Sequence, residues 1–79
     1  MWVECKRING GLFLDLRFRD GGVTRSRYIG KPGPGWVAGQ VVTLPPGVGA
    51  VDEVLRRLRG LRRPRPGDVL LAVRQYTLL

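Results

Sequence analysis

The strongest constraint on how this chain folds is the alternation of apolar and polar residues on both sides of Asn9-Gly10. Asn-Gly is a preferred pair for a two-residue type I′ turn, in which both central residues have positive φ. Such a turn pairs Cys5 with Leu14 and brings the apolar residues of both strands onto one face. A shift of one residue would place Lys6 opposite Leu14, so the pattern itself predicts the register.

The length of the second turn, between residues 19 and 23, decides which face receives the arginines that follow. A two-residue loop at positions 20 and 21 would place Arg25 and Arg27 on the apolar face. A three-residue loop with Gly22 left-handed pairs Arg19 with Val23 and places both arginines on the polar face. Burying unpaired arginine is far more costly than a bulge, so we expect the three-residue loop.

With this register, residues 1–29 form a β-meander with two different faces. We expect an apolar face made of Met1, Val3, Cys5, Leu12, Leu14, Leu16, Phe18 and Tyr28. The opposite face is expected to be basic and aromatic, with Trp2, Lys6, Phe13, Arg17, Arg19, Arg25 and Arg27. Glu4 and Asp15 become cross-strand neighbours on this face, and we expect Lys6, Arg17 and Arg27 to neutralise them.

Two further elements follow the meander. Proline and glycine alternate over residues 30–35 and predict a loop, after which residues 36–44 are rich enough in β-branched side chains for a fourth strand. Residues 51–59 place apolar side chains at the i, i+3, i+4, i+7 spacing of an amphipathic helix, with acids in the first turn and arginines in the last. Gly60 is expected to end this helix as a left-handed cap.

The C-terminal part is harder to assign. Residues 62–67 predict an extended, flexible basic linker, and residues 68–79 fit either a strand or a helix, with Val, Tyr and Thr after a Pro-Gly-Asp turn favouring the strand. The 79 residues therefore predict one small α+β domain. We expect an antiparallel sheet of three to five strands, beginning with the meander, and one helix packed on one face.

Composition favours a polyanionic or acidic partner. The net charge is +8, and twelve of the 14 basic residues are arginine. Such an excess favours nucleic acid, an anionic membrane or an acidic protein. The arginine, glycine and proline content is also typical of a GC-rich, thermophilic genome, and codon bias can raise arginine content without selection for binding.

Catalysis and metal binding are poorly supported by the residue types present. The chain has no histidine, one cysteine and six carboxylates, and its Gly-rich loop lacks the Gly-Lys-Ser/Thr ending of a P-loop. We therefore expect no enzyme activity and no cofactor. Cys5 is expected in the core, and the lone cysteine and the absence of a signal peptide predict a cytoplasmic protein. The longest apolar run, residues 69–73, is too short to span a membrane.

The sequence thus predicts a non-catalytic nucleic-acid-binding protein, with duplex DNA favoured over RNA because a β-ribbon fits the major groove. The expected contact residues are Trp2, Lys6, Phe13, Arg17, Arg19, Arg25, Arg27, Arg59, Arg62, Arg63 and Arg65. Stacking of unpaired bases on Trp2 and Phe13 would instead favour single strands. The alternatives are a solvated outer face, or a small phage or plasmid factor that docks on an acidic protein through residues 76–79, Tyr76 to Leu79.

A resemblance supports the DNA-binding interpretation. Residues 11–31, GLFLDLRFRDGGVTRSRYIGK, resemble hairpins near the N-termini of transposase-like and other mobile-element proteins. The order strand, strand, strand, helix is similar to the arm-binding domain of tyrosine integrases and to plant AP2-type domains. This resemblance implies a three-stranded sheet that enters the DNA major groove with a helix behind it. Residues 36–44 and 68–79 depart from that pattern.

Overall fold

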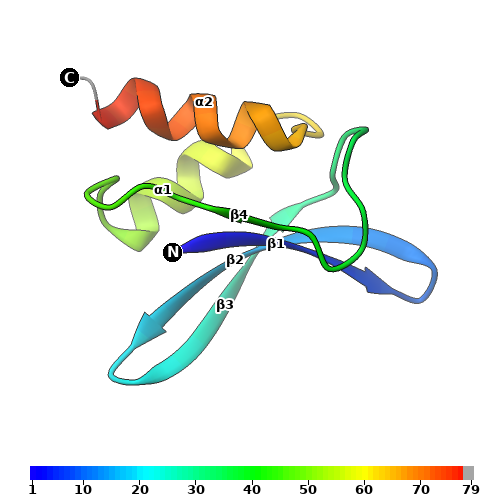
Figure 1. The fold of residues 1–79 in the computed structure, drawn as a ribbon, viewed down its shortest axis with the longest axis horizontal. Helices are drawn as coiled ribbons and strands as arrows, with labels where there is room; N and C mark the ends of the chain where they lie inside the picture. Colours follow the sequence, from blue (N-terminus) through cyan, green and yellow to red (C-terminus); the bar gives the residue numbers. More distant parts are fainter. Residues whose placement is uncertain (78–79) are drawn as a thin grey trace.

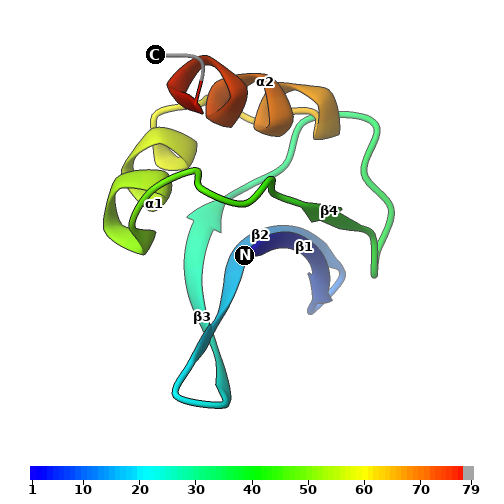
Figure 2. The same cartoon turned by 60° about the vertical axis from the view of Figure 1, so that its left-hand side comes forward.

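A computed structural model describes the backbone of residues 1–77 and the side chains of residues 1–74. Its elements are β1 (Trp2–Ile8), β2 (Gly11–Asp20), β3 (Val23–Gly30), β4 (Val41–Thr43), α1 (Val51–Arg59) and α2 (Pro66–Thr77). The strands form one antiparallel sheet in the order β3-β2-β1-β4. Both helices lie on the same face of this sheet (Figures 1 and 2). The predicted α+β class is confirmed, with two helices among the described residues where one was expected.

The first hairpin has the expected turn and register. Asn9 and Gly10 have φ of 51° and 81°, the positive values that a type I′ turn requires. Cys5 pairs with Leu14, and the two strands remain in register from Trp2↔Arg17 to Ile8↔Gly11. The apolar side chains of β1 and β2 therefore share the face that the helices cover.

The second hairpin differs from the prediction. Its loop is Gly21-Gly22, with φ of 58° and 83°, so Asp20 pairs with Val23. The expected three-residue loop is wrong because two consecutive glycines form a second type I′ turn, whose twist matches that of the flanking strands. Arg25 and Arg27 consequently lie on the same face as the core residues of β2.

The cost that we assigned to this arrangement does not arise, because β3 is an edge strand. Arg25 and Arg27 pair with Phe18 and Leu16, yet both arginines remain exposed to solvent. A bulge then shifts the register and leaves Ile29 in the core, while Tyr28 faces the opposite side and is 49% exposed. The expectation that Tyr28 belongs to the apolar face is therefore wrong.

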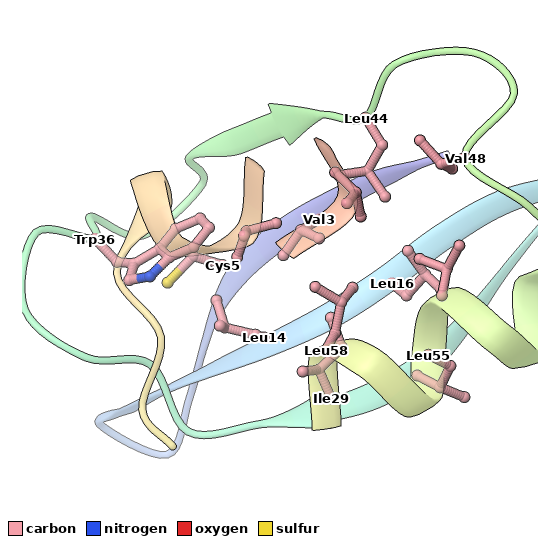
Figure 3. Packing of buried hydrophobic residues seen from close by; sticks show 13 residues of the cluster. Val3, Cys5, Leu14, Leu16, Ile29, Trp36, Leu44, Val48, Leu55 and Leu58 are labelled. Atoms are coloured by element: carbon pink, nitrogen blue, oxygen red, sulfur yellow. The ribbon is translucent and has the colours of Figure 1, made fainter. Parts of the chain in front are cut away.

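One hydrophobic core lies between the sheet and the two helices (Figure 3). Its buried members are Val3, Cys5, Leu14, Leu16, Ile29, Trp36, Leu44, Val48, Val54, Leu55, Leu58, Val69 and Val73. Trp36 was expected in a strand over residues 36–44, but only Val41–Thr43 are a strand. The indole of Trp36 instead reaches the core beside Cys5 from the loop before β4 (Figure 3).

Helix α2 replaces the strand that we favoured for residues 68–79 as far as residue 77, and residues 78–79 lie outside the described residues. Pro66 occupies the first helical position, where its missing N–H costs nothing, and the Asp68 carboxylate accepts a hydrogen bond of 2.9 Å from the N–H of Arg65. Val69 and Val73, four residues apart, face the core. These start signals outweigh the β-propensity of the helix interior.

The connection between the helices is a docked turn and not an extended, flexible linker. The buried Pro64 carbonyl accepts hydrogen bonds from the N–H of Gly33 at 3.0 Å and from Nε1 of Trp36 at 2.8 Å. The left-handed residue is Arg63, with φ of 43°, whereas Gly60 is right-handed at φ of −72°. The predicted left-handed cap at Gly60 is therefore wrong.

Candidate nucleic-acid interface

The β2–β3 hairpin extends away from both helices as a two-stranded ribbon, which we define as residues 17–27. Figures 1 and 2 show its turn at a distance from the helical layer. All residues from 19 to 27 are exposed except the half-exposed Thr24. At the tip, Val23 is 55% exposed and two glycines form the turn. Beyond the half-buried Arg17 and the buried Phe18 at its base, the ribbon therefore presents its side chains to solvent on both faces.

Four arginines are divided equally between the two faces of the ribbon. Arg17 and Arg19 point to the outer face, the one that the helices leave uncovered, because they alternate with the buried residues of β2. Arg25 and Arg27 point to the opposite face, because they pair with Phe18 and Leu16. The prediction that all four share one face is therefore wrong for two of them. As a consequence, the ribbon is basic on both faces.

The contacts of Arg19, Arg25 and Arg27 leave most of the charge of these three ribbon arginines exposed. Arg25 donates from Nε to Asp20 at 3.0 Å, an exposed ion pair of a kind that contributes little to stability. The guanidinium carbon of Arg27 lies 5.9 Å from the centre of the Phe18 ring, a cation–π distance. Among residues 1–74, neither Arg19 nor Arg27 forms an ion pair with a carboxylate.

The outer face of β1 and β2 is nearly neutral at its centre. Nζ of Lys6 lies 3.5 Å from Oδ2 of Asp15, and Nη1 of Arg17 lies 3.5 Å from Oε1 of Glu4. Lys6 and Arg17 thus neutralise the two carboxylates as expected, whereas Arg27 lies on the other face. In the part of the chain described here, Nε of Arg17 is buried and has no hydrogen-bond acceptor. The basic outer face predicted from the sequence is therefore reduced mainly to Arg19.

Aromatic side chains, in contrast, are more numerous on the outer face than expected. Trp2 and Phe13 lie there as predicted, on β1 and β2. Tyr28 of β3 joins them, with its ring centre 6.2 Å from that of Phe13 and the two rings tilted by 52°. Sequence reasoning missed Tyr28 because the register of β3 was shifted. The Gly21-Gly22 pair was the signal that could have corrected it.

The remaining predicted contact residues lie apart from the ribbon tip. Arg59 donates from Nε to the carbonyl of Tyr28 at 2.9 Å and so joins the end of α1 to the free edge of β3. Arg62, Arg63 and Arg65 are exposed on the docked turn between the helices. Figures 1 and 2 place this turn on the helical side of the sheet, far from the tip of the ribbon. The structure thus separates these three arginines from those of the ribbon.

The described residues offer little for other kinds of chemistry. They contain no group of three or more metal-ligating side chains. Burial raises the pKa of the Cys5 thiol above its ordinary value, against a smaller opposing effect of the Arg7 charge, so a reactive thiolate is disfavoured. None of the helices within residues 1–77 has the length and apolarity that a membrane span requires.

The predicted protein-docking segment, Tyr76 to Leu79, lies outside the described side chains, and residues 78–79 lie outside the described chain altogether. Comparison with known proteins adds no relative, since no family model, curated protein or solved structure matches this chain.

Proposed function

We propose that the protein binds duplex nucleic acid without catalysis, with DNA favoured over RNA, by placing the β2–β3 ribbon in the major groove. One observation carries the proposal: the ribbon projects beyond the helical layer and has exposed arginines on both faces, Arg19 on one and Arg25 and Arg27 on the other. The major groove of B-form DNA is about 12 Å wide and admits a two-stranded ribbon. Phosphates border such a groove on both sides, so a ribbon inserted there benefits from cations on both faces. The major groove of A-form RNA is too deep and narrow for this.

Individual residues of the ribbon have different roles in this proposal. Arg19 and Arg27, which lack carboxylate partners among residues 1–74, contact phosphates or base edges. Arg25 leaves its ion pair with Asp20 and contacts a phosphate instead, which costs little free energy because the ion pair is exposed. Val23 at the tip offers an apolar contact to a thymine methyl group.

The other predicted contact residues have secondary roles. Arg62, Arg63 and Arg65 contact the flanking backbone of a longer duplex. The resemblance to integrase and AP2-type domains stays a hypothesis that agrees with groove binding. In those families a three-stranded sheet enters the major groove, whereas here the two strands of the ribbon would enter it.

A salt titration with matched charge variants tests the proposal. Log affinity for duplex DNA should fall with log salt at about −0.9 per phosphate contacted, hence roughly −3 for Arg19, Arg25 and Arg27. The double variant Arg19→Gln and Arg27→Gln should reduce the size of this slope by about two. The control variant, Arg7→Gln and Lys31→Gln, removes the same charge from exposed residues outside the ribbon and should change the slope by less than about one.

Two results would contradict the proposal. One is the absence of duplex binding at low salt, and the other is an equal change of slope in the two double variants. Thermal unfolding should be measured in parallel, because both variants change exposed side chains and each substitution should alter the free energy of unfolding by about 0.5 kcal/mol or less.

A further inference from the structure

The outer face of the sheet carries three aromatic rings that no element among the described residues covers. Trp2, Phe13 and Tyr28 lie on β1, β2 and β3 respectively, while both helices pack on the opposite face (Figures 1 and 2). Tyr28 is 49% exposed, and Phe13 is its neighbour at 6.2 Å between ring centres. Rings held on neighbouring strands form a rigid surface on which planar groups can stack.

The charges around these rings suit bases at the centre and phosphates at one end. The Lys6–Asp15 and Arg17–Glu4 pairs leave the centre of the face neutral. Arg19 lies on the same face of β2 as Phe13, six residues further along the strand, which corresponds to about 20 Å. A nucleic-acid strand that leaves the ribbon therefore passes from exposed cations to the exposed ring of Tyr28 and the half-buried rings of Trp2 and Phe13.

We infer that the outer face stacks unpaired bases, so that the preferred ligand is a duplex with a single-stranded extension. This inference rests on the proposed function, because the ribbon holds the duplex part of the same molecule. The ion pairs separate Trp2 from the neighbouring rings of Phe13 and Tyr28, so the three rings do not form a continuous apolar patch. Such an arrangement suits individual bases better than the apolar side of a protein partner. Stacking requires no particular base, so the extension should be recognised with little dependence on its sequence.

Three ligands test the inference when each is titrated at the same salt concentration. They are a blunt duplex, the same duplex with a single-stranded tail, and the same duplex with a tail of abasic sites. The abasic tail keeps the phosphates but has no bases, so the difference between the two tails isolates stacking. We expect the tail with bases to bind at least about 5-fold more tightly than the abasic tail, the lower limit for one stacked base. Equal affinity for the two tails overturns the inference.

Matched variants then identify the rings. Tyr28→Thr and Trp2→Thr keep a residue with high β-propensity and remove the ring, so each should lose most of the difference between the two tails. Val41→Thr removes an exposed apolar side chain, 49% accessible, from the same face without removing a ring, and should keep that difference. Loss of the difference in all three variants, or in none, contradicts the assignment to the rings.

Tryptophan fluorescence adds a readout that does not depend on affinity. Trp36 is buried, and its Nε1 donates a hydrogen bond to the carbonyl of Pro64. A ligand on the outer face should therefore quench the fluorescence of Trp2 alone. Quenching should occur with the base-containing tail and not with the abasic tail. Binding of the blunt duplex without any gain from the tail overturns this inference and keeps the ribbon proposal. If the protein binds the tailed duplex but not the blunt duplex, the ribbon proposal is overturned. If it binds neither ligand, the ribbon proposal and this inference are both overturned.

Discussion

Gly33→Ala tests whether the loop after β3 is docked on the turn between the helices. A Cβ at position 33 would overlap the carbonyl oxygen of Arg63, because the two backbones approach each other closely. The φ of Gly33 is not in the left-handed region, so an alanine there has no intrinsic backbone penalty. The whole effect of the substitution must therefore come from the contact between the two segments.

The size of the effect follows from the bonds that this contact supports. To admit the methyl group, the loop must move away from Pro64, whose carbonyl accepts bonds from Gly33 at 3.0 Å and Trp36 at 2.8 Å. Losing two such bonds costs about 1 to 3 kcal/mol in total. Trp36, only 6% exposed, would lose part of its packing as well. We expect a loss of about 2 to 4 kcal/mol in the free energy of unfolding.

Thermal unfolding followed by circular dichroism measures this loss. For a domain of this size, 1 kcal/mol shifts Tm by roughly 4 to 8 °C, so Gly33→Ala should lower Tm by roughly 8 to 32 °C. The control is Gly67→Ala in α2, where a Cβ meets no atom within 4 Å. That substitution should stabilise the protein by about 0.5 to 1 kcal/mol, because alanine is the better helix former. Equal melting temperatures for Gly33→Ala and the wild type would refute the docked turn.

Three other predictions concern the faces of the sheet, the buried thiol and the docked turn. Leu14→Ala should cost about 2 to 5 kcal/mol and the exposed Arg27→Ala at most about 1 kcal/mol, so similar melting losses would show that the faces are assigned wrongly. Burial raises the pKa of Cys5, so the folded state keeps this proton to higher pH than the unfolded chain, and stability should decline as pH rises through the thiol range. Urea titrations across that range should show no such decline in Cys5→Ala. Neutralising the three arginines of the docked turn, Arg62, Arg63 and Arg65, should reduce the slope of log affinity against log salt by up to about three on a long duplex. The same variant should leave the slope unchanged on a short duplex that spans only the ribbon.

The sequence allowed the first hairpin and α1 to be predicted because local signals and burial agree there. Asn9-Gly10 demands a type I′ turn, and the register that this turn imposes is the one that collects Cys5 and Leu14 on one face. The register of the second hairpin was predicted wrongly because the three-residue loop was compared only with a two-residue loop at positions 20 and 21. The two-residue loop that forms is Gly21-Gly22, and the aim of avoiding buried arginine favoured a different register. Nothing in the sequence shows that β3 is an edge strand, and this position is what removes the penalty.

The docked turn and Trp36 depend on contacts that no local pattern reports. Gly33 and Pro64 are 31 positions apart, and each looks like an ordinary loop residue in its own segment. The start of α2 was visible in principle, since Pro66 and Asp68 are helix start signals. We gave more weight to the β-propensity of the residues that follow. The candidate site changed accordingly: Arg25 and Arg27 moved to the other face, and Tyr28 took a place on the outer one.

The position of β3 at the edge of the sheet explains why its arginines are compatible with both the fold and the proposed function. An unpaired edge invites pairing with another chain, and charged side chains on the edge strand discourage it. Arg25 and Arg27 lie on that strand, and Arg59 occupies the Tyr28 carbonyl on it with a hydrogen bond of 2.9 Å. A central strand could not carry two exposed arginines opposite core residues. The ribbon is therefore basic on both faces because β3 has no strand beyond it within residues 1–77, which ties the proposed groove binding directly to the strand order.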